Sequence, residues 1–276
     1  MVSFDKFYQS NLTEGRIPSI FRKATPEELA TRREQYKKIA MDEWVETLMK
    51  RKDIRWDAGR KCWDVINGGN VKLMDLPFES LPVRFGKVDG FFQCNAMTEL
   101  KTLDGFPSEV GGYFDLDNCP KLVDLQGCPE IVDGSFYLMN VGIGSLAGCS
   151  KTVGASFYCQ YNKKLTSVEG CPTSIGSAVN CNQNPNLTSI AGFQDSVNGN
   201  FDCSNNNLTA LRGSPKFVRW DFMCHENRQL TSLEGCPSEI GGLFHVWGCG
   251  RKFSLKEIGE HCKVGGDVKK SKEKLL

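Results

Sequence analysis

The chain has 276 residues, of which 40% are hydrophobic and 24% charged, so it is long enough to bury a core. No run of eighteen apolar residues occurs, which excludes a membrane-spanning helix, and the first residues lack the layout of a secretory signal, so we expect a cytoplasmic protein. The net charge of +1 is uneven: residues 71–250 carry 12 basic and 18 acidic side chains, which argues against a nucleic-acid groove there.

The first predicted element is a helix over residues 25–50. Thr25 is a suitable N-cap, Pro26 suits the first helical position, and Glu28 completes a capping box. Apolar side chains fall roughly on one face: Leu29, Tyr36, Ile39, Ala40 and Leu48. The helix would either cap the open end of a repeat stack or dock a partner, and both readings stay open. Residues 54–70 are expected to connect this helix to a β-sheet.

A repeat of 21 or 22 residues occupies positions 71–250. Its first marker is an apolar residue, mostly phenylalanine: Val71, Phe92, Phe114, Phe136, Phe157, Val179, Phe201, Phe222 and Phe244. The residue two positions later is also apolar and is cysteine in five copies, and a valine or isoleucine stands four positions before the marker. Alternating apolar residues are typical of one face of a short strand. Glycine and often proline then turn the chain in each copy.

Stacking explains why such a repeat would fold. One turn of about 22 residues cannot bury its apolar row alone, whereas stacked copies form a continuous core with a parallel sheet along one side. We therefore predict a β-rich solenoid of about nine rungs, roughly 40 Å long at about 4.8 Å per strand. The predicted organisation is an N-terminal helical cap (1–70), a repeat domain (71–250), and a short C-terminal helix with a basic tail (251–276).

Asparagine recurs three residues after the strand cysteine, as Asn162, Asn184, Asn206 and Asn227. An inward asparagine can bond the backbone groups of adjacent turns, which would otherwise be buried unpaired. The pattern F-x-C-x-x-N-x-L resembles the core of leucine-rich repeats over residues 71–250, with Cys119 on an asparagine position. It departs from that family by lacking a leucine three residues before the strand phenylalanine and by having a short return segment in place of a helix. The family's horseshoe curvature is therefore not implied.

A narrower resemblance rests on the phrases LTSLEGCPSEIGG and FDCSNNN, found at residues 230–242 and 201–207. These two sequence segments are similar to segments in intracellular repeat proteins of tailed bacteriophages of the T-even-like kind. This resemblance implies a phage source and no particular reaction.

The thirteen cysteines are expected to be reduced fillers. Nine of them occupy repeat positions where a small buried hydrophobic residue is wanted, and a reducing cytosol disfavours disulfides. No C-x-x-C or Cys/His pair has zinc-site spacing, so no metal or other cofactor is predicted. A catalytic Cys/His pair would have to combine Cys249 with His245, with no third group at a recognisable spacing. We therefore predict no catalytic residues.

The C-terminal segment begins with a short predicted helix from Ser254 to His261, which has its own S-x-x-E box. Four lysines then form a basic tail: Lys269, Lys270, Lys272 and Lys274. Such a tail could contact nucleic acid or an acidic partner, but it is more often a solvated terminus.

Residues that alternate with the buried strand positions would face outward as a ladder, and Asn95 is expected among them. The candidate partner-binding residues on this ladder are Asp115, Asp117, Tyr137, Met139, Tyr158, Gln160, Met223, His225, His245 and Trp247. They fall into a middle cluster and a C-terminal cluster. Tyrosine, tryptophan and methionine are enriched in interface cores, and folding alone does not demand them here. The alternative is that the tyrosines only shield the sheet and that Trp247 belongs to a C-terminal cap.

The leading hypothesis is a non-enzymatic repeat scaffold whose strand face binds a host or phage protein, such as a host defence factor or toxin that it inhibits. The second hypothesis is a structural or accessory component of the virion. The third and weakest is an enzyme with its site at Cys249 and His245.

Overall fold

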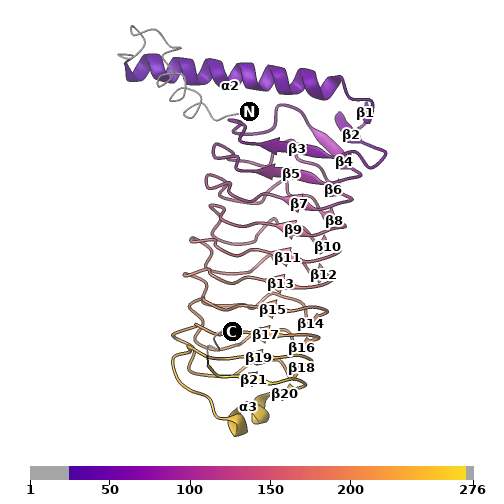
Figure 1. Ribbon diagram of the computed structural model, residues 1–276. Helices are drawn as coiled ribbons and strands as arrows, with labels where there is room; N and C mark the ends of the chain where they lie inside the picture. The colour runs from indigo at the N-terminus through magenta and orange to yellow at the C-terminus, as the bar shows by residue number, and fades with distance from the viewer. Residues whose placement is uncertain (1–24, 272–276) are drawn as a thin grey trace, which may run out of the picture.

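The computed structural model describes residues 25–271, and it shows a parallel β-solenoid with a long helix across its N-terminal end and a short helix near its C-terminal end (Figure 1). The predicted fold class is confirmed. The rungs stack almost directly above one another in Figure 1, and from Val71 to His245 each return segment consists of turns and a second short strand, without a helix. Within residues 25–271, no helix is long and apolar enough to cross a membrane.

The nine predicted strands and one further strand, β21 (Val268–Lys269), form one parallel sheet of ten strands, stacked in register. Its strands are β3 (Val71–Met74), β5 (Phe92–Asn95), β7 (Phe114–Asp115), β9 (Phe136–Tyr137), β11 (Phe157–Tyr158), β13 (Val179–Asn180), β15 (Phe201–Asp202), β17 (Phe222–Met223), β19 (Phe244–His245) and β21 (Val268–Lys269). The marker residues lie inside the stack because side chains alternate between the two faces of a strand. Phe157, for example, is fully buried, whereas its neighbour Tyr158 is half-buried.

The prediction of a single sheet was incomplete, because the valine or isoleucine four residues before each marker forms a second ladder. A seven-stranded sheet contains β1 (Ile54–Asp57), β2 (Cys62–Val65), β4 (Phe85–Val88), β6 (Glu109–Val110), β8 (Ile131–Val132), β10 (Thr152–Val153) and β12 (Ser174–Ile175). A four-stranded sheet continues it with β14 (Ser196–Val197), β16 (Phe217–Val218), β18 (Glu239–Ile240) and β20 (Lys263–Val264).

The break between these two sheets has a local cause at Gln194. Its side-chain amide accepts a hydrogen bond from the Ile175 backbone N–H (2.8 Å) and donates one to the Ile175 carbonyl (2.9 Å). The amide therefore satisfies the backbone groups that a neighbouring strand would otherwise pair. This copy of the repeat has Phe193-Gln194 where most copies have cysteine or serine followed by proline or serine.

The predicted asparagine ladder is confirmed. Asn184 donates to the carbonyls of Cys159 (3.1 Å) and Cys181 (2.7 Å), and its Oδ1 accepts from the backbone N–H of Asn162 (2.7 Å). Each such side chain therefore ties its own turn to the turn before it. Cys119 lies at the same position and directs its thiol to the Cys94 carbonyl (3.2 Å).

The turn glycines adopt the positive φ that the sequence suggested. Gly235 has φ +83°, and a Cβ added there would lie 2.5 Å from Cα of Arg212 in the turn before. The same position holds glycine with positive φ in seven copies: Gly105, Gly127, Gly148, Gly170, Gly192, Gly213 and Gly235. Glycine is needed here for both conformation and space.

The N-terminal helix α2 (Pro26–Met49) has the predicted capping box and packs on the first turn of the stack. The ring of Trp44 meets Phe78 edge-on at 5.9 Å and Phe85 at 6.3 Å. The prediction that Ile39 belongs to the packed face was wrong, because Ile39 is 57% exposed and Trp44 takes that role. Within the described structure, α2 lies across the N-terminal end of the stack, with Ala40 and Leu48 buried in the common core (Figure 1).

Two further segments near the ends differ from expectation. Residues 54–70 are not a plain connection, because β1 and β2 form an antiparallel hairpin that starts the second ladder. The helix α3 (Leu255–His261) is present as predicted, but β20 and β21 then add one more turn to both ladders beyond residue 250. The sequence KVGGDV at residues 263–268 repeats the V-G-G phrase of earlier copies, which explains the added turn. Lys272 and Lys274 lie outside the described residues.

Candidate functional site

The candidate site is the outer face of the ten-stranded sheet. We use "outer face" for two rows of side chains that run along the stack. The first row is Gln93, Asp115, Tyr137, Tyr158, Asn180, Asp202, Met223 and His245, and the second is Asn95, Asp117, Met139, Gln160, Asn182, Ser204, His225 and Trp247. Strand register aligns the first row directly from turn to turn. All ten predicted partner-binding residues therefore lie on one face, although not in one cluster.

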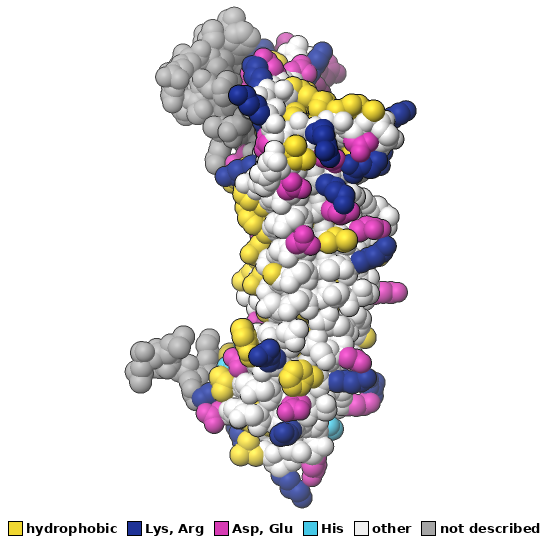
Figure 2. Space-filling model, turned by 90° about the vertical axis from the view of Figure 1, so that its right-hand side faces the viewer, with side chains coloured by type: hydrophobic (Ala, Val, Ile, Leu, Met, Phe, Trp, Pro, Cys, Tyr) yellow, Lys and Arg dark blue, Asp and Glu magenta, His cyan; other side chains and the backbone are white. Residues whose placement is uncertain are grey.

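An aromatic ladder of four residues, Phe91, Tyr113, Tyr137 and Tyr158, runs along the N-terminal half of this face. Tyr137 and Tyr158 belong to its first row, and Phe91 and Tyr113 adjoin the two rows. The rings of Tyr137 and Tyr158 stack with centroids 5.0 Å apart and planes 2° from parallel. Tyr113 meets Tyr137 edge-on at 6.1 Å, and Phe91 stacks on Tyr113 at 4.6 Å. Figure 2 shows hydrophobic side chains gathered along the corresponding edge, on the left of the upper half of the stack.

Phe91 and Tyr113 were missed from the sequence. They stand one residue before the strand phenylalanine, whereas the alternation of strand side chains predicts outward positions one and three residues after it. The available signal was the aromatic doublet in two consecutive copies, Phe91-Phe92 and Tyr113-Phe114, because only one ring of each doublet can be buried in the stack.

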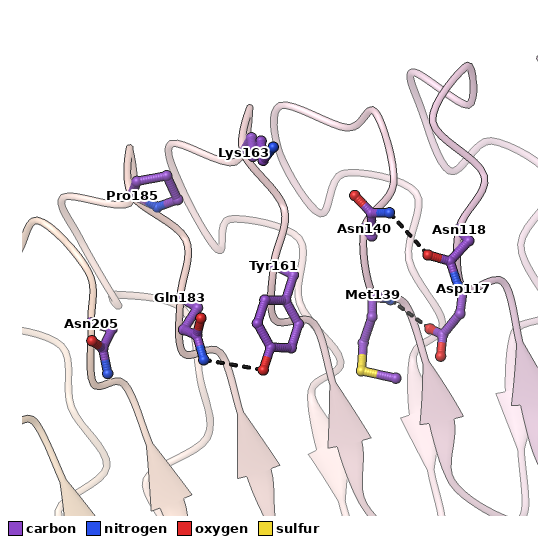
Figure 3. Close-up of a pocket in the computed structure, with 9 residues that line it drawn as sticks. All are labelled: Asp117, Asn118, Met139, Asn140, Tyr161, Lys163, Gln183, Pro185 and Asn205. Atoms are coloured by element: carbon purple, nitrogen blue, oxygen red, sulfur yellow. Dashed lines mark hydrogen bonds between the residues drawn. The ribbon is translucent and has the colours of Figure 1, made fainter.

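A groove with a volume of about 650 Å³ lies where the strands end (Figure 3), and its lining residue Met139 stands two residues after Tyr137 of the aromatic ladder. It is lined by Asp117, Asn118, Met139, Asn140, Tyr161, Lys163, Gln183, Pro185 and Asn205. Asn140 donates a hydrogen bond to Asn118 (2.9 Å), and Gln183 donates one to the Tyr161 hydroxyl (3.1 Å). Of the predicted residues, only Asp117 and Met139 line this groove.

Five of the other lining residues share a backbone feature that sequence reasoning overlooked. Asn118, Asn140, Tyr161, Gln183 and Asn205 all have φ between 54° and 64°, at the corner that comes after each strand. Asparagine is enriched in this left-handed conformation, so its recurrence four residues after the marker was a usable signal. Two of the five corners hold another residue, Tyr161 and Gln183, and the Tyr161 side chain is 46% exposed.

Asp115 and Asp117 differ sharply in their surroundings. Asp115 is only 7% exposed, and its carboxylate accepts hydrogen bonds from Gln93 Nε2 (2.9 Å), Asn95 Nδ2 (3.2 Å) and the backbone N–H of Asp117 (2.9 Å). The buried Asp115 carboxylate therefore holds Gln93 and Asn95 in place and has little surface left for a partner, although the sequence predicts it as a contact residue. Asp117 accepts one hydrogen bond, from the backbone N–H of Met139 to Oδ1 (2.7 Å). No residue in the range 25–271 donates to its Oδ2.

Burial raises the pKa of the Asp117 carboxyl to about 7, and the nearby negative charge of Asp115 adds to the rise, against the hydrogen bond from Met139. The ordinary value is 3.8, so between about pH 4 and 7 the folded protein keeps a proton that the unfolded chain loses. We expect the free energy of unfolding to fall as pH rises through this window. Asp117→Asn, which retains the acceptor for Met139, should become increasingly stabilising relative to wild type between pH 4.5 and pH 8.

Urea unfolding at the two pH values measures this difference. Asp133→Asn serves as the control, because Asp133 is exposed and comes directly after β8 of the second ladder. A constant stability difference between Asp117→Asn and wild type at both pH values would contradict the expectation.

The predicted C-terminal cluster also forms, near the C-terminal end of the face. The His225 ring stacks on Trp247 at 4.5 Å and 17°, and the His245 ring lies 6.1 Å from His225. Met223 aligns with His245 in the sheet register. Polar side chains separate this cluster from the aromatic ladder, namely Asn180, Asn182, Asp202 and Ser204. The face therefore carries two separate aromatic patches.

The cysteines are all free thiols, and most are buried. Desolvation raises the pKa of the Cys171 thiol to about 12, which keeps it protonated and unreactive. Cys249 lies at the asparagine position of its turn and directs its thiol to the carbonyl of Cys224 (3.7 Å), while the His245 ring lies beside His225 on the outer face. Within residues 25–271, no group of three His, Cys, Asp or Glu side chains could hold a metal ion.

Searches of known protein families, of curated proteins and of solved structures found no match to this chain.

Proposed function

We propose that the protein is a non-enzymatic scaffold that binds another protein through the outer face of its ten-stranded sheet. The observation that carries this proposal is the aromatic ladder. Four aromatic rings contact one another in a row, two pairs stacked and joined edge-on, on a surface where the repeat requires nothing apolar. Large aromatic side chains are common anchors of protein interfaces. The stack beneath them is held by backbone pairing between successive turns, so little conformational entropy would be lost when a partner binds.

The neighbouring groove supports the same conclusion. It joins apolar side chains such as Met139 and Tyr161 to a set of amides, which is the mixture of packing and hydrogen-bonding groups that an interface uses. Because the repeat sequence resembles that of phage proteins, we expect the partner to be a protein of a bacterial host. A host defence enzyme or toxin that the scaffold inhibits is the form of this function that we favour.

Affinity capture from host lysate, followed by a binding assay with the retrieved protein, tests the proposal. We expect Tyr137→Ala or Tyr158→Ala to weaken binding by at least about 2 kcal/mol, or roughly 30-fold, because interface anchors lose that much on truncation. Trp220→Ala is the matched control, since Trp220 is an aromatic residue that is 54% exposed and lies outside the outer face.

Two outcomes would contradict the proposal that the outer face binds a protein. If removal of residues after Ser271 abolishes binding while both tyrosine variants retain it, the basic tail carries the function. If mass spectrometry finds the protein in many copies in purified phage particles, the virion role becomes the better explanation.

A further inference from the structure

Asp117, Met139 and Gln160 occupy the same place in three successive turns, in the second row of the outer face. Asp117 offers an oxygen, Oδ2, that receives no hydrogen bond from the described residues, and Oε1 of Gln160 is buried without a donor. Two acceptors that lack donors therefore flank the Met139 side chain. A buried acceptor such as Gln160 Oε1 is rarely left without a hydrogen bond in a folded protein, and Asp117 lines the groove, so both oxygens call for a donor that the described residues do not supply.

The charge of the surroundings indicates what kind of donor fits. Neither row of the outer face contains a lysine or arginine from Gln93 to Trp247, all of which the structure describes. Among the residues that line the groove, Lys163 is the one cation and Asp117 the one carboxylate, and the amides of Asn118, Asn140, Gln183 and Asn205 offer both acceptors and donors. A cation with several N–H groups is complementary to this surface, whereas a phosphate group would face Asp117 and find one lysine.

An arginine side chain matches these features better than lysine does. Its planar guanidinium presents five N–H donors, and its aliphatic stem packs well on apolar side chains. Met139, Tyr161 and Pro185 supply such a surface in the groove (Figure 3). The raised pKa of Asp117 is consistent with a carboxylate that has no positive neighbour to stabilise its charge.

We propose that the groove binds an arginine side chain of the partner protein, with the guanidinium donating to Asp117 Oδ2 and the stem lying against Met139 and Tyr161. This inference rests on the proposed protein-binding function and specifies one contact of it. The tyrosines of the aromatic ladder would then anchor the neighbouring part of the same partner.

The test uses the full chain and N-acetyl-arginine amide as the probe, with NMR of the ¹⁵N-labelled protein as the readout. The backbone N–H of Met139 is the reporter, because it donates to Asp117. We expect its resonance to shift in a saturable way with the arginine probe at pH 8, and not with the neutral citrulline analogue. Asp117→Asn should weaken binding of the arginine probe at least tenfold, whereas Asp133→Asn, with the same loss of charge outside the groove, should leave it unchanged.

The proposal is overturned if no saturable shift occurs, if citrulline binds as well as arginine, or if Asp117→Asn and Asp133→Asn weaken binding equally. Its failure can be told apart from failure of the proposed function. If Tyr137→Ala abolishes binding of a captured partner and Asp117→Asn does not, the scaffold proposal is supported and the arginine contact is ruled out.

Discussion

Phe157→Ala is expected to lower the free energy of unfolding by about 3–5 kcal/mol, the usual cost of removing a large aromatic side chain from a packed core. Phe157 is fully buried in β11, and its ring lies 5.5 Å from that of Phe136 in the preceding turn. Val179 occupies the same position in the next turn. A void at Phe157 would remove contacts with both neighbours, because each turn is packed only by the turns beside it.

Tyr158→Ala is the matched control for this prediction. Tyr158 is adjacent in the same strand, has nearly the same size, and points to the outer face. Its truncation should cost about 1 kcal/mol, mainly the loss of the stacked pair with Tyr137. Urea unfolding of the two variants measures the contrast. Equal losses would mean that the assignment of inward and outward side chains is incorrect.

Asn206→Ala should lower the free energy of unfolding by about 1–3 kcal/mol, because it leaves buried backbone groups without partners. The Asn206 side chain donates to the carbonyls of Cys181 (3.0 Å) and Cys203 (2.9 Å), and it accepts from the backbone N–H of Asn184 (2.8 Å). These bonds join two turns in the middle of the stack, where neither end can fray to relieve the loss.

The control for Asn206 is Asn207→Ala, whose side chain is exposed; changes at such positions usually stay within about 0.5 kcal/mol. Asn95 would be a poor control although it lies on the outer face as predicted. Its Nδ2 donates to Asp115 and its Oδ1 is buried, so its loss would disturb a polar network. A melting temperature for Asn206→Ala as high as that of Asn207→Ala would contradict the role of the ladder.

The repeat period and the inward or outward direction of most strand side chains could be read from the sequence alone. Strand side chains alternate with a period of two, so the apolar positions of each copy identify the buried face without any knowledge of neighbouring turns. The inward asparagines came from the same reasoning, since a polar residue repeated among buried positions must bond to the backbone. The N-terminal capping box of α2 could also be predicted locally, because it involves only Thr25, Pro26 and Glu28.

Other features were decided only by the tertiary structure, because they depend on how one turn packs on the next. Asp115 and Asp117 look equivalent in the sequence, yet Gln93 and Asn95 from the turn before satisfy Asp115 and leave Asp117 with a free oxygen. The second ladder required valines some 22 residues apart to pair, and the groove required five successive corners to align. Local propensity describes a single turn, whereas the burial and hydrogen bonding of its side chains are determined by the stack. The groove therefore became visible only in the assembled solenoid.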